Sequence, residues 1–265
     1  MKLIIESGAT KTSWCTGPVR FETAGMNFAH QSGEFLRGIL ADAAGRIGPG
    51  VDEVHLYAAG LIGKPPVDLC EFFPGADVEY ASDLLAAARA VCGRSEGVAA
   101  ILGTGSNSCL YDGEKIVANF HSGGYIIGDE GGAASLGRMF VADFIKDLVP
   151  SELAQAFSAK FDSSYAGIVG NVYRSGAPAK YFGSIAPVIT ANLHIPYAAR
   201  LVADNFRAFF ERALLRYGKG LPVGIIGGFA AAMEKQLREV AAEYGVVISS
   251  ISASPLEGLI RYHGI

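Results

Sequence analysis

The first 50 residues show a regular order of apolar and polar positions. Apolar runs over 3–5, 12–16 and 19–23 predict three short strands that are joined by turns. Apolar side chains then recur at helical spacing over 33–45 and predict a helix. The chain is therefore expected to open with a strand–turn–strand–turn–strand run that leads into a helix.

A second group of elements follows before residue 97. The pattern predicts strands over 54–60 and 78–81, with a short helix over 65–73 between them. A further helix is predicted over 84–91. Alternating strands and helices of this kind are typical of an α/β protein.

Near residue 97 the opening pattern starts again. Residues 98–102, 106–111 and 115–119 predict three strands, and Asp112-Gly113 between the last two is a strong hairpin signal. The two halves have low sequence identity but the same order of elements, so we interpret the architecture as duplicated.

The rest of the chain is mainly helical and contains no long linker. Helices are expected over 133–148, 151–160, 163–172, part of 195–217, 230–243 and 256–262, and strands over 223–226 and 246–248.

Composition narrows the class of protein. The chain has 265 residues, enough for one large domain or two modest ones, and its 50% apolar and 18% charged residues exclude a disordered chain. The net charge of −4 argues against a protein that binds nucleic acid. No apolar stretch approaches the roughly 18 residues of a membrane helix, and the first residues turn polar too soon for a signal peptide. We expect a cytoplasmic protein without nucleic-acid or membrane partners.

Glycine accounts for 34 residues, and three glycine-bearing turns carry candidate chemistry. Turns at 6–12 and 103–108 each join two predicted strands, and their N–H and hydroxyl groups could hold a phosphate, with Lys11 as an added cation. At 224–229 a strand ends in two glycines before a helix, where a flat ligand could lie. Each turn, taken alone, is also compatible with an ordinary hairpin or with plain strand–helix packing.

Carboxylates complement these turns. Asp83 stands where a strand ends and a helix begins, a usual place for a functional side chain, although Ser82 or Asp83 could also simply cap the helix. Asp129 and Glu130 lie between glycines ahead of a predicted helix. They could hold hydrated Mg²⁺ or a sugar hydroxyl, or could only complement the helix dipole.

The order of these pieces resembles the sugar kinase/Hsp70/actin superfamily. Within it the chain looks most similar to the N-acetylglucosamine kinase family, which is grouped with the benzoyl-CoA reductase activase-type ATPases. The resemblance spans residues 2 to 263 and is carried by 82–83, 101–107 and 128–131. It implies an α/β fold of two duplicated ribonuclease H-like (actin-like ATPase) domains around a central cleft. The expected domains are 1–96 and 97–265, and the last helix is able to pack back on the first domain.

The resemblance also implies a reaction, the ATP-dependent phosphorylation of a sugar hydroxyl, with an N-acetylated amino sugar such as N-acetylglucosamine as the favoured substrate. Its cofactors would be ATP and Mg²⁺, and a homodimer is a possible assembly. Asp83 would be the catalytic base. The ATP phosphates would contact Gly8, Ala9, Thr10, Lys11, Thr12, Gly103, Thr104, Gly105 and Ser106, and the adenosine Gly227, Gly228 and Phe229. The sugar would contact Asn27, Ser82, Asp83, Asn107, Asp129 and Glu130, and the metal Glu6 and Asp129.

One departure from the family pattern concerns the metal. The family usually has Asp where this chain has Glu6, whose carboxylate reaches one methylene further, and Mg²⁺ demands near-ideal octahedral geometry. Two alternatives therefore accompany the kinase: a non-catalytic nucleotide- or sugar-binding protein with a drifted metal site, and an activase-type ATPase. The four isolated cysteines offer no obvious iron–sulfur ligand set for the activase. The five histidines show no paired metal spacing.

Overall fold

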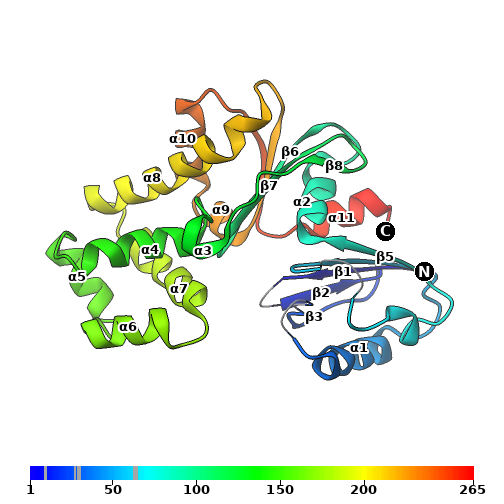
Figure 1. The fold of residues 1–265 in the computed structure, drawn as a ribbon. Helices are drawn as coiled ribbons and strands as arrows, with labels where there is room; N and C mark the ends of the chain where they lie inside the picture. Colours follow the sequence, from blue (N-terminus) through cyan, green and yellow to red (C-terminus); the bar gives the residue numbers. More distant parts are fainter. Residues whose placement is uncertain (9–10, 27, 29–30, 62–64) are drawn as a thin grey trace. The chain divides into compact units, whose positions relative to one another are not determined.

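The computed structural model describes residues 1–8, 11–26, 28, 31–61 and 65–265 (Figure 1). These residues form two compact units. Unit 1 comprises Met1–Ser95, Gly113–Lys115 and Pro255–Ile265, and unit 2 comprises Glu96–Asp112 and Ile116–Ser254. The C-terminal helix is thus part of the N-terminal unit.

Unit 1 is built on a five-stranded sheet in the order β3-β2-β1-β4-β5. Its strands are β1 (Lys2–Ser7), β2 (Lys11–Cys15), β3 (Arg20–Ala24), β4 (Glu53–Ala58) and β5 (Asp77–Ser82). The first three pair antiparallel as a meander, and β1, β4 and β5 run parallel. Its helices are α1 (Gly33–Ile47), the 3₁₀ turn η1 (Leu69–Glu71), α2 (Asp83–Cys92) and α11 (Leu256–His263).

The apolar run at the start of the chain explains why β1 is central. Successive side chains of a strand point to opposite faces, so Leu3 and Ile5 enter one core with Leu36 and Leu40 of α1. Ile4 enters a second, smaller core with Leu259 of α11. A strand that is covered on both faces has to be apolar at consecutive positions.

Unit 2 repeats this topology in a second five-stranded sheet, in the order β10-β9-β6-β7-β8. Its strands are β6 (Gly97–Leu102), β7 (Ser106–Tyr111), β8 (Ile116–Ala118), β9 (Val223–Ile226) and β10 (Ile248–Ser252). Again the first three form an antiparallel meander, and β6, β9 and β10 are parallel. The predicted duplication is confirmed at the level of topology.

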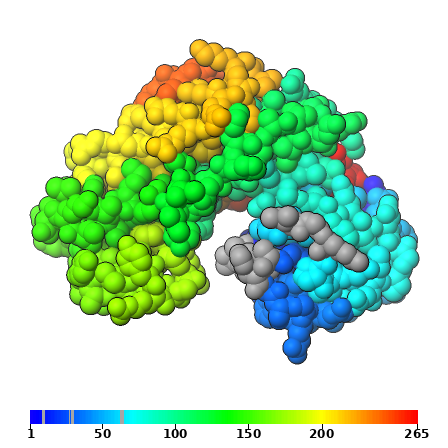
Figure 2. All heavy atoms as spheres, viewed as in Figure 1, coloured from blue at the N-terminus to red at the C-terminus, as the bar shows by residue number. Residues whose placement is uncertain are grey.

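The helices of unit 2 follow the meander. They are α3 (Gly124–Ile127), α4 (Ala133–Phe144), α5 (Ser151–Ser158), α6 (Tyr165–Tyr173), α7 (Pro178–Thr190), α8 (Pro196–Arg212), η2 (Leu214–Tyr217), α9 (Gly228–Ala232) and α10 (Glu234–Glu243). Helices α4 to α7, green to yellow-green, gather beside the sheet in Figure 1, and the same colours form one lobe of the surface in Figure 2. The close approach of α4 and α7 requires Gly137, since a Cβ there would lie 2.0 Å from the Phe182 carbonyl oxygen.

Several predicted elements differ from the observed ones. Helix α7 was not predicted individually, because Pro178 and Pro187 interrupt its pattern; Pro187 lies inside the helix. The helix expected over 65–73 is only η1 within the described residues, and the last strand lies at 248–252 rather than 246–248 because its exposed positions are serines. The helix expected over 230–243 is divided at Met233 into α9 and α10.

Among the described residues, none of the helices combines the length and the apolar character that crossing a membrane requires.

Candidate active site

The second glycine turn, Gly103 to Ser106, lies at the carboxyl end of β6 in unit 2. Helix α4 begins next to it: the N–H groups of Ala133 and Ala134 donate to the carbonyl oxygens of Gly103 and Thr104 at 2.9 and 2.8 Å. The turn carbonyls thereby satisfy N–H groups that the first turn of a helix leaves free. Among the described residues the N–H groups of Thr104 and Gly105 have no hydrogen-bond partner. They are donors that an anion could use.

Asp129 brings a carboxylate onto this turn. A Cβ added to Gly105 would lie 2.8 Å from Asp129 Oδ2, and the Ser106 N–H donates to Asp129 Oδ1 at 3.3 Å. Burial raises the pKa of the Asp129 carboxyl, and the Ser106 N–H opposes that rise. The backbone of Asp129 is in the left-handed region, with φ of 54°, which is unusual for a residue with a side chain. Such strain is often found at functional sites.

The glycines after β9 reach the same edge of the sheet. Gly227 has φ of 136°, and a Cβ there would lie 2.2 Å from the carbonyl oxygen of Leu102, directly before the second turn. Gly228 begins α9, and its α-carbon faces open space. Phe229, in contrast, packs inward, with its ring 5.7 Å from that of Phe206. The structure therefore brings the second and third glycine motifs together at the carboxyl ends of two parallel strands.

Glu130 and the glycines after it are held by α8. Arg212 donates to Glu130 Oε1 at 2.9 Å. The fully buried Asn205 accepts from the Gly131 N–H at 3.1 Å and donates to the Gly132 carbonyl oxygen at 3.2 Å. Asn205 is not among the residues predicted from the sequence, although an amide among the apolar positions of a helix is a signal of a buried polar contact.

In unit 1 the described part of the first turn is closed by a hydrogen bond from the Gly8 N–H to the Lys11 carbonyl oxygen at 3.0 Å. The Lys11 ammonium pairs with the Glu22 carboxylate. The Thr12 hydroxyl is buried beneath the turn, 2.6 Å from the Ser7 hydroxyl. Three predicted site residues, Ala9, Thr10 and Asn27, lie outside the described residues.

Two carboxylates mark the carboxyl ends of parallel strands in unit 1. Glu6 lies near the end of β1, and Asp83 follows β5 as the first residue of α2. Burial raises the pKa of Glu6 to about 7; the Lys11 ammonium opposes this rise, and the Asp83 carboxylate adds to it. Burial also raises the pKa of Asp83, against the hydrogen bond that its Oδ1 accepts from the Leu84 N–H at 2.9 Å.

The N-cap of α2 is Ser82 rather than Asp83. The Ser82 hydroxyl oxygen accepts from the Leu85 N–H at 3.2 Å. The helix therefore does not depend on the Asp83 carboxylate for its cap, and one Asp83 oxygen is left for other chemistry.

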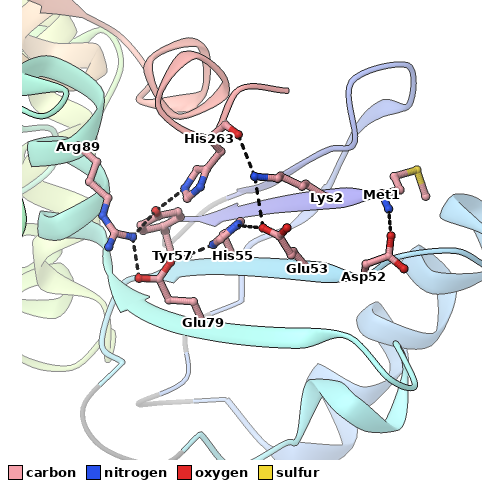
Figure 3. Close-up of polar contacts among 9 residues, drawn as sticks. All are labelled: Met1, Lys2, Asp52, Glu53, His55, Tyr57, Glu79, Arg89 and His263. Atoms are coloured by element: carbon pink, nitrogen blue, oxygen red, sulfur yellow. Dashed lines mark hydrogen bonds and ion pairs between the residues drawn. The ribbon is translucent and has the colours of Figure 1, made fainter.

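A partly buried polar cluster in unit 1 joins residues that the sequence did not connect (Figure 3). His55 and His263 stack with ring centroids 3.7 Å apart, and His55 Nδ1 lies 2.9 Å from Glu79 Oε2. Arg89 donates to the Tyr57 hydroxyl at 2.7 Å and pairs with Glu79. Tyr57 therefore donates its own proton to His263 Nε2, 2.7 Å away.

Among the described residues, one group of possible metal ligands is close enough to hold an ion. It consists of His55, Glu79 and His263, whose ligand atoms lie within 4.8 Å of one another. The Arg89 guanidinium already supplies a positive charge to Glu79, and His263 Nε2 already accepts from the Tyr57 hydroxyl. We interpret the cluster as a polar attachment of α11 to β4 and β5.

Solved structures with the same fold identify the class. The N-acetylglucosamine kinase candidate of Porphyromonas gingivalis is 39% identical, with a TM-score of 0.93 over 99% of this chain and 98% of its own. The corresponding candidate of Chromobacterium violaceum is 18% identical, with a TM-score of 0.75 over 98% of both chains. A ROK family glucokinase of Streptomyces griseus, in complex with glucose and AMPPNP, is 16% identical, with a TM-score of 0.61 over 98% and 97%. No family model and no curated protein matches the sequence.

The duplicated meanders define the actin-like ATPase fold, and the solved structures that resemble the chain place it among the sugar kinases of that fold. The chain belongs to the N-acetylglucosamine kinase family of the sugar kinase/Hsp70/actin superfamily.

Proposed function

We propose that this protein transfers the γ-phosphoryl group of ATP to a hydroxyl of an N-acetylated amino sugar such as N-acetylglucosamine. The observation that carries the proposal is the convergence in unit 2 of two unpartnered N–H donors, the Asp129 carboxylate and Gly227 at one sheet edge. The 39% identity to the Porphyromonas gingivalis protein supports the same substrate class. The glucokinase that holds AMPPNP has the same fold, which supports ATP as the donor.

Each unit contributes its own groups to the reaction. In unit 2 the N–H groups of Thr104 and Gly105 bind phosphate oxygens, and Gly227 and Gly228 leave room for the adenosine. In unit 1 the first turn, with Gly8 and Lys11, binds phosphate, while the buried Thr12 holds that turn from beneath. Phosphoryl transfer depends mainly on positioning and charge neutralisation, and backbone donors supply both.

Asp83 is the proposed base. The hydroxyl of the acceptor sugar becomes more acidic as the new P–O bond forms, and a carboxylate oxygen within hydrogen-bond reach takes its proton. Because burial raises the pKa of Asp83, its carboxylate is a better proton acceptor than an exposed aspartate. Ser82, Asn107, Asp129 and Glu130 are the proposed sugar contacts among the described residues, and Asn27 completes that prediction.

Glu6 in unit 1 and Asp129 in unit 2 are the proposed magnesium ligands. Both are carboxylates, the ligand type that Mg²⁺ prefers, and burial raises the pKa of each. A buried carboxylate that lacks a full counter-charge is stabilised by a nearby cation. When bound, Mg²⁺ neutralises charge on the phosphates. A homodimer and a cytoplasmic location remain predictions from the sequence.

A coupled assay of ADP release tests the proposal, with a panel of sugars that includes N-acetylglucosamine and glucosamine. We expect sugar-dependent ADP formation, fastest with the acetylated sugar. Binding of ATP without turnover on any sugar would instead identify the non-catalytic alternative. The activase alternative requires iron in the purified protein. In the described part of the chain, the group of possible metal ligands is His55, Glu79 and His263, and it contains no cysteine.

A further inference from the structure

We propose that Asn119 is a positioning residue that locks the amide of Asn107, so that its Nδ2 donor, and not its oxygen, faces the sugar. The inference rests on the proposed function, since it takes Asn107 to be a sugar contact. It adds a residue that the sequence analysis did not single out, and it states what kind of atom the sugar must offer.

Asn107 lines a hollow of about 480 Å³ in unit 2. The wall also includes Ser106, Phe120, Glu130, Arg212 and Arg216. Asn107 is half-buried on β7, one residue after the second glycine turn. A group bound in this hollow would therefore lie next to the turn that is proposed to bind phosphate.

The orientation of the Asn107 amide follows from its partners. Its Oδ1 lies 2.9 Å from the Ser108 N–H, which can only donate, so this atom must be the acceptor oxygen. A flipped amide would set two donors against each other. The oxygen is thus engaged, and among the described residues the Nδ2 group has no acceptor.

Asn119 donates a second hydrogen bond to Asn107 Oδ1 and so holds the amide in the same orientation. Its Nδ2 lies 2.7 Å from the Ser108 carbonyl oxygen, which can only accept, so this atom must be the donor nitrogen. The same Nδ2 donates to Asn107 Oδ1 at 2.9 Å. Both of its hydrogens are therefore used, and Asn107 Oδ1 receives two hydrogen bonds.

Hydrogen bonds of the buried Tyr217 hold the backbone on both sides of the Asn107–Asn119 pair. The Tyr217 hydroxyl donates to the Ser108 carbonyl oxygen at 2.7 Å and accepts from the Phe120 N–H at 3.1 Å. Ser108 and Tyr217 are both buried, and the ring of Tyr217 lies 4.8 Å from that of Phe120. These contacts fix the residues on both sides of the Asn107–Asn119 bond, so the amide cannot rotate without losing several bonds at once.

The hollow consequently presents donors to its ligand. Besides Asn107 Nδ2, the Arg216 guanidinium lies 3.8 Å from the centre of the Phe120 ring, and Arg212 approaches Glu130. A substituent that accepts hydrogen bonds, such as an acyl oxygen or a hydroxyl oxygen, fits this wall. A protonated amine, which can only donate, finds no acceptor in Asn107 Nδ2 or in the two guanidinium groups.

Asn119→Asp tests the lock because it keeps the size of the side chain and removes its donor. The carboxylate would face the Ser108 carbonyl and Asn107 Oδ1, both acceptors, and would therefore release or flip the Asn107 amide. The measurement is kcat/KM for N-acetylglucosamine divided by kcat/KM for each analogue that lacks one oxygen, namely glucosamine and the monodeoxy sugars. This ratio does not depend on the fraction of active enzyme.

In the wild type we expect at least one analogue to be disfavoured at least tenfold. That penalty should fall severalfold or more in Asn119→Asp and in Asn107→Ala. It should fall by less in Asn119→Ala. If Asn119→Asp does not fold, Asn119→Ala takes its place in the test. Asn171→Ala is the matched control, since the Asn171 amide bonds only within α6. Unchanged ratios in an active Asn119 variant would overturn the inference and leave the proposed function standing. A wild type that is inactive on every sugar would overturn both.

Discussion

At the scale of single residues, Asp83 and Glu6 of unit 1 have different expected roles, Asp83 as the base and Glu6 as a metal ligand. Asp83 does not cap α2, because Ser82 does, so its removal should leave the helix intact. We expect Asp83→Asn to lower turnover by about 10²–10⁴-fold, since the amide cannot take a proton, while the unfolding midpoint and ATP affinity stay close to those of the wild type. Asp77→Asn, at the exposed start of β5, is the matched control. Near-normal turnover of Asp83→Asn would refute the assignment.

Removal of the Glu6 charge should raise the stability of the protein and lower its activity. Its pKa of about 7 lies above its ordinary value of 4.5, so the stability it contributes is complete below pH 4.5 and is lost as the pH rises through 7. Glu6→Gln removes this loss. We expect the variant to be more stable than the wild type at pH 8, by on the order of 2 kcal/mol, with the difference absent at pH 4.5.

The activity of the same variant should fall. Without the charge, Glu6→Gln should need more Mg²⁺ for its half-maximal rate, whereas Glu6→Asp should need the same or less. Urea unfolding at the two pH values and Mg²⁺ titration of turnover check the two expectations separately. Identical Mg²⁺ dependence in the wild type and both variants would show that Glu6 has no metal role.

At the scale of elements, the glycine turns join strands to functional groups. Gly105→Ala would push its Cβ to 2.8 Å from Asp129 Oδ2, so the carboxylate has to move and the Ser106 N–H loses its acceptor. We expect ATP affinity, measured by calorimetry, to fall at least tenfold with little change in the unfolding midpoint. Gly170→Ala is the control, because its Cβ meets open space on α6. Wild-type ATP affinity in a folded Gly105→Ala protein would identify the turn as a plain hairpin.

The elements that the sequence predicted well are those whose cause is local. The apolar runs before residue 8 and before residue 103 define the two central strands, and the turn residues that follow define the hairpins. Helix α7 was missed because local rules count Pro187 against a helix, whereas its fit against α4 at Gly137 is a tertiary effect.

At the scale of the whole chain, contacts between distant segments were out of reach of the sequence. His55 and His263 are separated by more than 200 positions, and nothing in their spacing announces that they stack. Asn205 makes two hydrogen bonds to Gly131 and Gly132, 74 and 73 positions away. Asn119 makes two hydrogen bonds to Asn107 and Ser108, 12 and 11 positions away. The candidate site could be predicted from the order of its motifs, but the residues that support it from behind could not.

The histidine stack also sets a pH dependence. Burial, and then His55 and Arg89, lower the pKa of His263 to about 4, so the folded protein keeps it neutral while the unfolded chain protonates it near 6.5. Stability from this group is present above pH 6.5 and is lost as the pH falls toward 4. The Glu79 pKa of about 2 makes its own loss begin only below 4.5.

Glu6 also titrates between pH 4.5 and 7, so His263 is isolated by comparison with a His263 variant that keeps Glu6. We expect the stability of the wild type relative to His263→Gln to fall between pH 6.5 and 4.5 by roughly 1.4 kcal/mol per pH unit at most, the value for one proton. Chemical denaturation at pH 7.5, 6.5, 5.5 and 4.5 measures this difference. A difference that stays constant across these pH values would contradict the neutral, partly buried state of His263.

In the proposed reaction a sugar hydroxyl, and not water, accepts the phosphoryl group. The most direct measurement is ³¹P NMR of the wild type with ATP, Mg²⁺ and N-acetylglucosamine. We predict a phosphomonoester resonance that grows with ADP in equal amounts, needs the sugar, and grows about 10²–10⁴-fold more slowly with Asp83→Asn. ADP that appears only with inorganic phosphate, at the same rate with and without any sugar of the panel, would show that water is the acceptor and that the protein is not a sugar kinase.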